Sequence, residues 1–520
     1  MTVFLPTRRS VIGGLAAAPF ILTAPSRAQL GFADYPFTLG VAAGDALPDG
    51  FVIWTRLAPK PMEPLGGMPM APVPVDWEVA EDEHFHTIVA KGTEKAWPEL
   101  GHSVHAEVTG LKPGRPYWYR FHCAGERSLV GRAATLPAPG TAVDRVRFAA
   151  IGCQHFEAGW YTAFRHAAEE PLDFMFHYGD YIYEYSPGYV LDAFDRPIEP
   201  VRRYATREPY SLDDYRIRYA QETLDADLQA ARAAAPWYCT YDDHEVQNNW
   251  AGQWDEHGTP PDIFLLRRRA ALQAWYEHMP VRRSSYPDAT GAVHFRRRID
   301  FGTLVRMHFP NTRLYRSDQP CNDGFKPMCA GAYAPDQQMV SSEEESWLDQ
   351  GFASSRQRWQ GLAQQVMMAP IDRRTPEYPN AKPTFNMDSW AGYPAQRDRL
   401  FAMFGKHPGG NVVVVTGDEH QNWAMDLMHD DKIVASEYVS TSMTSGGDGH
   451  DVRPGNEEIM KDNPFLHWTN DRRGYVVSEV TPEAWTGHYR VVDAVTQKDM
   501  PIKTVASWAV ESGKPGLVRA

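Results

Sequence analysis

From residue 146 onward, short apolar runs alternate with segments of helical periodicity, and this alternation constrains the fold more than any other feature. Five runs have the length and composition of buried strands: 146–151, 174–176, 237–241, 303–309 and 412–416. Two segments, 161–170 and 342–363, carry the period of a helix. Strands that alternate with helices predict an α/β domain, whose sheets bind ligands beyond the carboxyl ends of their strands.

The region 36–137 has a different sequence pattern, in which short segments of alternating or β-branched residues are separated by Pro/Gly turns. The segments 51–55, 75–79 and 104–108 are expected strands, and the turn 109–114 leads into 117–121. This turn resembles the one before a late strand of fibronectin-type sandwiches, where a tyrosine braces the corner. We therefore predict an N-terminal all-β domain of the fibronectin or immunoglobulin type. Three of its histidines are expected to have packing or surface roles: His102, His105 and His122.

The first residues predict a leader. Arg8 and Arg9 precede an apolar run at 11–24, and Ser26-Arg27-Ala28 carries the small residues that a signal peptidase recognises. Paired arginines favour the twin-arginine export machinery as a partner, which exports folded proteins. We expect a signal peptide at 1–28 and a periplasmic or secreted protein. The alternative is a buried first helix that begins with an arginine pair.

Charge and cysteine content exclude some classes of protein. The formal net charge is -14, so the chain gains nothing from the counterion release that drives nucleic-acid binding. Local cations must therefore hold any anionic substrate. After residue 30 no apolar run has the roughly 20 residues that a membrane span needs. Of the five cysteines, Cys321 and Cys329 could form a disulfide in an oxidising periplasm, and the sequence leaves that pairing open.

Polar clusters follow the predicted strands of the second region. There are four: 152–155 (Gly-Cys-Gln-His), 179–184 (Gly-Asp-Tyr-Ile-Tyr-Glu), 242–249 (Asp-Asp-His-Glu-Val-Gln-Asn-Asn) and 417–421 (Gly-Asp-Glu-His-Gln). Cysteine beside Tyr, His and Asp suits a transition metal, whereas carboxylate and amide oxygens suit a harder cation such as Ca²⁺. The clusters predict a multi-metal site. The alternative is ordinary capping of the loops between strands and helices.

These motifs resemble those of the PhoD-type alkaline phosphatases and phosphodiesterases, relatives of the purple acid phosphatases within the calcineurin-like metallophosphoesterases. The matching segments lie in the expected order: 41–45, 179–184, 212–216, 242–249, 359–365 and Thr441-Ser442. The resemblance covers nearly everything after the leader. It implies a catalytic domain at 146–510, built as a metallophosphoesterase β-sandwich flanked by helices, behind the β domain at 36–137.

The resemblance also implies roles for individual residues. The ligands of an Fe³⁺ would be Cys153, Asp180, Tyr183 and His420, and those of a Ca²⁺ would be Asp180, Asp243, Asn248 and Asp418. Asp180 would bridge the two metals, and His244 would stabilise or protonate the leaving group. Three positions depart from the pattern of many relatives: Cys153 stands for Asp, Asp243 for Asn, and Asn311 for Asp.

The implied activity is hydrolysis of phosphate monoesters or diesters by attack of a metal-bound hydroxide. The expected partners are phosphoester small molecules or phospholipid-like diesters. Arginines considered for the phosphate are Arg165, Arg216, Arg313 and Arg316. Three alternatives stay open: a phospholipase D-like or teichoic-acid phosphodiesterase, an exported iron redox protein, and a secreted binding module.

Overall fold

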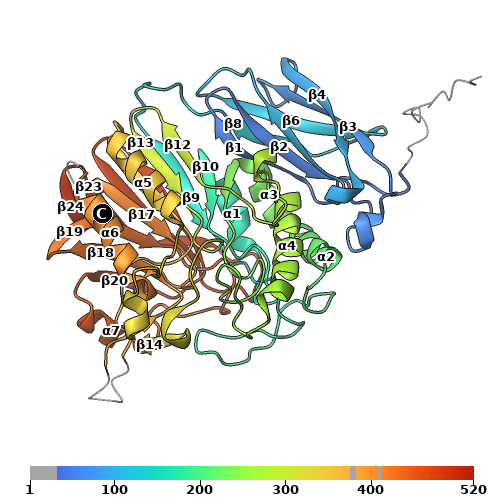
Figure 1. The fold of residues 1–520 in the computed structure, drawn as a ribbon. Coiled ribbons are helices and arrows are strands. Elements are labelled where there is room, and N and C mark those ends of the chain that lie inside the picture. Colours follow the sequence, from blue (N-terminus) through green and yellow to red (C-terminus); the bar gives the residue numbers. More distant parts are fainter. Residues whose placement is uncertain (1–31, 375–381, 408–410) are drawn as a thin grey trace, which may run out of the picture.

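Two large β-sheets, seen at the centre and left of Figure 1, form the body of the protein. The computed structural model describes residues 32–374, 382–407 and 411–520, so the predicted signal peptide lies outside the described residues. The first sheet has ten strands in the order β24 (Lys514–Arg519), β23 (Ile502–Glu511), β22 (Ala484–Val492), β21 (Gly474–Val480), β9 (Val146–Ile151), β10 (Phe174–His177), β11 (Pro236–Cys239), β1 (Val41–Leu47), β2 (Gly50–Arg56) and β5 (Ser103–Val108). The second has seven in the order β12 (Arg297–Phe301), β13 (Val305–Phe309), β15 (Trp359–Ala363), β17 (Val412–Thr416), β19 (Lys432–Val439), β18 (Asn422–His429) and β20 (Leu466–Asn470).

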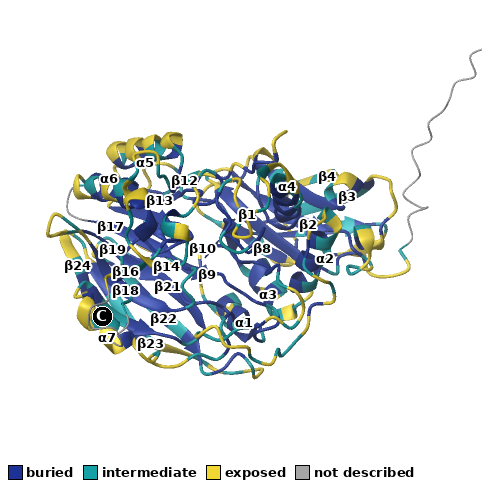
Figure 2. Cartoon of the chain, turned by 60° about the horizontal axis from the view of Figure 1, so that its bottom comes forward, coloured by how far each residue is buried: buried dark blue, intermediate teal, exposed yellow. Residues whose placement is uncertain are grey.

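Aromatic side chains pack the two sheets against each other. Phe174 of β10 stacks on Phe301 of β12, with ring centroids 5.3 Å apart. Trp359 of β15 meets Trp485 of β22 edge to face at 6.1 Å. Successive strand residues point to opposite faces, so alternate residues of β9, namely Val146, Phe148 and Ala150, enter this core. Figure 2 shows the strands as a buried layer beneath more exposed helices.

Helices cover the outer faces of both sheets. The other face of β9–β11 joins a second core with residues of α1 (Thr162–Glu169), α2 (Leu212–Thr223), α3 (Ala226–Ala234) and α4 (Pro261–His278). The second sheet is covered by α5 (Ser342–Ser354) and α6 (Pro394–Gly405), while α7 (Asn456–Asp462) precedes β20. This is the predicted β-sandwich flanked by helices, and the fold-class prediction is confirmed.

The N-terminal region is all-β, as predicted, but it shares a sheet with the rest of the chain. Its strands β1, β2 and β5 extend the ten-stranded sheet, because β1 pairs in parallel with β11. Over them lies a sheet of β4 (Ile88–Ala96), β3 (Val73–Ala80), β6 (Pro116–Cys123) and β7 (Glu126–Arg127), with β8 (Gly131–Ala134) on β6. The Tyr117 hydroxyl donates to the Lys112 carbonyl at 3.1 Å, which is the expected tyrosine corner. The boundaries 36–137 and 146–510 stay predictions.

The predicted helix at 342–363 is wrong in its second half. Helix α5 ends at Ser354, and residues 359–363 form strand β15 between β13 and β17. All five residues of β15 are buried. The apolar spacing of a helix runs through Leu348, Phe352, Trp359 and Leu362. The last two lie in β15, where packing in the core of the sheet overrides the local periodicity.

A short two-stranded sheet and a disulfide lie outside the large sheets. Strand β14 (Phe325–Pro327) pairs with β16 (Thr384–Asn386), and Cys321 and Cys329 form a disulfide. His105 stacks on Tyr276 of α4 at 4.5 Å, the packing role expected for it. Within the described residues, no helix has the length and apolar character needed to cross a bilayer.

Candidate metal centre

The four polar clusters meet where strands of both sheets end. Three of them follow β9, β10 and β11 of the first sheet, and the fourth follows β17 of the second. Five of their residues other than glycine have positive φ: Cys153 at 52°, Asp180 at 56°, Asn249 at 52°, Asp418 at 67° and His420 at 52°. Residues other than glycine rarely adopt this left-handed backbone conformation, and backbone strain of this kind is concentrated at functional sites. The turns therefore hold these side chains in positions that relaxed loops would not provide.

The aromatic ring of Tyr178 separates the ends of β9 and β17. A Cβ atom at Gly152 would lie 2.3 Å from this ring, and one at Gly417 would lie 2.2 Å from it. The Tyr178 hydroxyl donates to the Thr441 carbonyl at 2.5 Å. Glycine is required at both positions because any side chain would collide with the ring that spaces the two sheets here.

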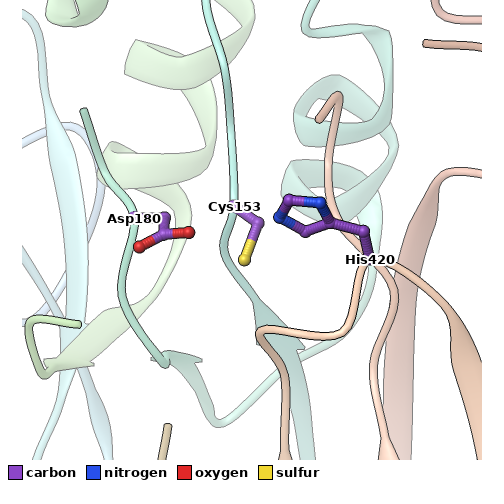
Figure 3. Close-up of side chains that lie close together, drawn as sticks. All are labelled: Cys153, Asp180 and His420. Carbon is purple, nitrogen blue, oxygen red and sulfur yellow. The ribbon is translucent and has the colours of Figure 1, made fainter. Parts of the chain in front are cut away.

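Donor atoms gather in three overlapping groups beyond these strand ends. In each group one ligand atom per residue lies within 4.8 Å of the others. The groups are Cys153–Asp180–His420, Asp180–Asp243–His244 and Asp242–Asp243–Asp418. Figure 3 shows the first, with the Cys153 sulfur between the carboxylate of Asp180 and the ring of His420. Asp180 belongs to two groups, which is the position a bridging carboxylate needs.

Tyr183 reaches the first group with its hydroxyl. The hydroxyl donates to Asp180 Oδ2 at 2.9 Å and lies 3.1 Å from His420 Nε2. The ring is held on both faces by imidazoles, since His244 stacks on it at 4.1 Å and His155 at 4.6 Å. The phenol oxygen therefore points at the carboxylate and imidazole donors from a fixed ring.

Glu245 fixes the backbone of two clusters. Its carboxylate accepts hydrogen bonds from the N–H groups of Asp180, Tyr181 and Asp242, at 3.0, 2.6 and 2.8 Å. Glu245 is fully buried, and burial raises the pKa of this carboxyl to about 7. One side chain thus ties the turn after β10 to the turn after β11.

A buried arginine offsets part of the negative charge. Arg313 pairs with Asp242 at 2.5 Å, with Asp243 at 3.3 Å and with Asp388 at 2.7 Å. Burial acts to raise the pKa of Asp243, but Arg313 and His244 outweigh it and lower the pKa to about 2. Asn311 fixes the backbone at Arg313, because its Oδ1 accepts the backbone N–H of Arg313 at 3.1 Å.

Arg313 does not neutralise all of the buried carboxylates, and the remaining negative charge fits bound cations. Asp180 Oδ1 and Asp242 Oδ2 are buried and have no hydrogen-bond partner among the described residues. Burial, together with the neighbouring carboxylates, raises the pKa of both Asp180 and Asp418 well above the usual range. Carboxylates that repel one another at a buried site fit metal ions. The thiol, phenol and imidazole of the first group fit a softer transition metal, and the carboxylates of the third group fit a harder cation.

The carboxylate of Glu184 holds the imidazole of His244 through its Nδ1 atom. Its Nδ1 lies 2.8 Å from Glu184 Oε2, and its Nε2 lies 3.9 Å from Asp243 Oδ2. Burial acts to lower the pKa of His244, but Asp243 and Glu184 outweigh it and raise the pKa well above the ordinary value. His420 differs, because burial lowers its pKa to about 3 and leaves the imidazole neutral. His244 can therefore donate a proton, while His420 offers a lone pair.

A cavity of about 380 Å³ opens over these groups. Its lining includes His155, Tyr183, Tyr185, Tyr189, His244, Asn248, Phe325, Arg373, Asp388, Asp418, His420 and Arg453. Asn248 also lines this cavity, and its amide donates to Glu256 Oε2 at 2.8 Å. The volume is that of a small-molecule site and exceeds what a phosphate alone requires.

The arginines considered from the sequence do not line this cavity. Arg165 pairs with Asp499 and Arg216 with Glu277, while Arg313 and Arg316 are held by Asp388. Among the described lining residues the arginines are Arg373 and Arg453. Arg373 is paired with Glu419, and Arg453 lies 2.7 Å from Asp471.

Sequence reasoning missed several residues of this centre. Asp242, Glu184 and Glu245 stand inside the recognised clusters, so their spacing could have drawn attention to them. Asp388 follows the short strand β16 far from any cluster, and only the fold brings it to Arg313.

The chain is similar to phosphatases along its length. A family model described as PhoD-like phosphatase matches residues 148–489, and one described as PhoD-like phosphatase, N-terminal domain, matches residues 23–137. Alkaline phosphatase D of Bacillus subtilis is 46% identical over 509 residues, which cover 97% of this chain and 86% of that protein.

Two solved structures share the fold. One described as the structure of PhoD has a TM-score of 0.91 at 47% identity, and the match covers 94% of this chain and 93% of that one. A purple acid phosphatase from yellow lupin seeds has a TM-score of 0.55 at 12% identity, over 92% of this chain and 74% of that one. At that identity the second match speaks for the fold alone.

Proposed function

The chain belongs to the PhoD-like phosphatase family, and from this premise we propose that it is an exported, metal-dependent phosphoesterase. The observation that carries the proposal is Asp180, whose buried carboxylate belongs to two donor groups, and each group reaches the same cavity through an imidazole, His420 in one and His244 in the other. Two cations held there supply the positive charge that activates a water and neutralises a phosphate. The curated relative is an alkaline phosphatase, which agrees with this chemistry.

The donor types divide the residues between two cations, with Asp180 shared by both. Those proposed to hold Fe³⁺ are Cys153, Asp180, Tyr183 and His420, and those proposed to hold Ca²⁺ are Asp180, Asp243, Asn248 and Asp418. Asp242 joins the oxygen-rich group, since one of its oxygens is buried without a partner among the described residues. Soft and phenolic donors favour the transition metal, and carboxylate and amide oxygens favour calcium.

His244 is proposed to donate a proton to the leaving-group oxygen. It lines the cavity, and Glu184 orients its ring through Nδ1 at 2.8 Å. The raised pKa of His244, caused chiefly by Asp243 and Glu184 against the effect of burial, keeps a proton available. General acid catalysis of this kind contributes roughly 10²- to 10⁴-fold to a rate.

The leaving group provides a direct test of this role. In His244→Asn, kcat for phenyl phosphate should fall far more than kcat for p-nitrophenyl phosphate, because p-nitrophenolate leaves as a stable anion without a proton from an acid. His257→Asn is the matched control, since His257 is exposed. Equal losses on the two esters would remove His244 from the acid role.

Phosphodiesters are a second candidate substrate class, favoured by the aromatic wall of the cavity. Tyr189 is 49% exposed and Phe325 is 53% exposed, and both line the cavity beside the donor groups. Such rings can hold a second organic arm, as on a phospholipid-like or teichoic-acid diester. A kcat/KM for bis(p-nitrophenyl) phosphate above that for the monoester supports this candidate, and the reverse order rejects it.

Export by the twin-arginine route to the periplasm or beyond is part of the proposal. Arg8 and Arg9 precede the apolar run of the predicted leader. The disulfide between Cys321 and Cys329 agrees with an oxidising compartment.

An iron redox protein or a secreted binding module would need neither the carboxylate group at Asp242 nor the acid at His244.

A further inference from the structure

The oxygen of Tyr183 has a third neighbour besides Asp180 and His420. The hydroxyl of Ser445 lies 2.6 Å from the phenol oxygen. Ser445 is 2% exposed and belongs to the segment 440–445 that follows β19. Asp180 and His420 are proposed to bind the same cation as Tyr183. Of the three neighbours, Ser445 is therefore the one that acts on the phenol oxygen without serving as a ligand.

The backbone around Cys153 holds Ser445 in place. The N–H of Ser445 donates to the Cys153 carbonyl at 3.2 Å, and its hydroxyl lies 2.9 Å from the same oxygen. On the other side, the Ser442 hydroxyl donates to the Ser445 carbonyl at 2.7 Å. Ser445 thus couples the turn that carries Cys153 to the ring of Tyr183.

The single proton of the serine hydroxyl has two acceptors. While Tyr183 keeps its own proton, it donates to Asp180 at 2.9 Å, and Ser445 can donate to the Cys153 carbonyl. When the phenol oxygen binds a cation it carries negative charge. Charged acceptors form shorter and stronger hydrogen bonds than neutral carbonyls, so the serine proton then goes to Tyr183.

We propose that Ser445 is a positioning residue that donates a hydrogen bond to the metal-binding oxygen of Tyr183 and so weakens electron donation from that oxygen to the metal. The inference rests on the proposed function and on the proposed iron ligation by Tyr183. Hydrogen bonds to ligand atoms tune the reduction potential of a metal. Without this hydrogen bond, Tyr183 donates more strongly, which stabilises oxidised iron and moves the phenolate-to-iron absorption to longer wavelength.

The test uses the mature, iron-containing protein and two spectroscopic measurements. Ser445→Ala should move the visible band to longer wavelength and make the iron reduction potential more negative. Ser445→Thr keeps a hydroxyl and should hold both values near those of the unchanged protein. Ser445→Cys is a weaker donor and should give a smaller shift in the same direction, which keeps the test valid if Ser445→Ala loses iron.

A double-mutant comparison identifies the atom on which Ser445 acts. In the Tyr183→Phe background, Ser445→Ala should change neither the residual band nor the potential. An equal change in that background would overturn the inference, because Ser445 would then act through the Cys153 turn. Unchanged values in Ser445→Ala would overturn it as well.

Phosphatase activity separates this inference from the proposed function. A protein that hydrolyses p-nitrophenyl phosphate but has no phenolate band would reject the role of Ser445 and keep the phosphoesterase proposal. A band that responds to Ser445→Ala in a protein without hydrolytic activity would support the role of Ser445 and reject the proposed function.

Discussion

The phenol ring of Tyr183 is stacked on the imidazole of His244, with ring centroids 4.1 Å apart and an interplanar angle of 28°. The stack joins the proposed iron ligand to the proposed general acid. His155 stacks on the other face of Tyr183 at 4.6 Å. A change to Tyr183 that keeps the ring should therefore preserve the packing of the site and alter its metal chemistry alone.

Tyr183→Phe tests the phenol oxygen as a ligand. The oxidised protein should be coloured, because a phenolate or thiolate bound to Fe³⁺ donates electron density into the metal. Tyr183→Phe should weaken or shift the visible band with little change in the thermal unfolding midpoint, since both ring stacks remain. Cys153→Ser should shift the band in a different way, because it removes the soft donor. A colourless protein that is fully active with calcium or zinc alone would rule out the iron assignment.

Glu245→Gln tests how the backbone of the centre is held. The amide NH₂ of Gln would face at least one of the N–H groups that Glu245 now accepts, from Asp180, Tyr181 and Asp242. Leaving such a buried donor unpaired costs about 1–3 kcal/mol, which urea unfolding would measure. Metal affinity should fall roughly 10- to 100-fold, as for other partners of metal ligands. Glu343→Gln on the exposed side of α5 should change neither quantity.

Removal of calcium tests the oxygen-rich group. A calcium-selective chelator should abolish hydrolysis of p-nitrophenyl phosphate, and added Ca²⁺ should restore it, because Asp243, Asn248 and Asp418 offer only oxygen ligands. The visible band should persist, since Cys153 and Tyr183 hold the other cation. Full activity after chelation and long dialysis would point to a tightly bound transition metal in this group.

The arginine pair tests export. Arg8→Lys combined with Arg9→Lys should keep the protein in the cytoplasm, because the twin-arginine route recognises the guanidinium pair. Cell fractionation followed by a phosphatase assay measures this. Unchanged periplasmic activity of the double variant would count against the route.

The sequence predicts the strands and turns of this protein better than the connections between them. Runs such as 146–151 and 412–416 are buried strands because nearly all of their side chains are apolar, with Arg147 the one charged residue between them. The period of 342–363 misled because Trp359 and Leu362 continue an apolar spacing that the sheet, not a helix, buries. Nothing local to 41–47 indicates that β1 joins β11, since that pairing depends on contacts nearly two hundred residues away.

The candidate site shows the same division. The polar clusters that follow apolar runs could be found from the sequence, and the family resemblance singled out Cys153, Asp180, Asp243, Asp418 and His420 within them, which the structure brings together. Asp388 could not be chosen, because it follows a short strand without a motif, and Ser445 lies just past the matching pair Thr441-Ser442 with nothing in the sequence to mark it. Their roles come from Arg313 and Tyr183, which reach them through the fold.

The most direct test of the two-metal account is the metal content of Asp180→Asn beside that of the unchanged mature protein, measured with hydrolysis of p-nitrophenyl phosphate. Because Asp180 belongs to two of the three donor groups and is the proposed bridge between the cations, iron and calcium should fall together and the rate should fall by more than 100-fold, beyond the roughly 10- to 100-fold typical of residues that only support a ligand. Near-normal metal content with a near-normal rate in Asp180→Asn would contradict the account.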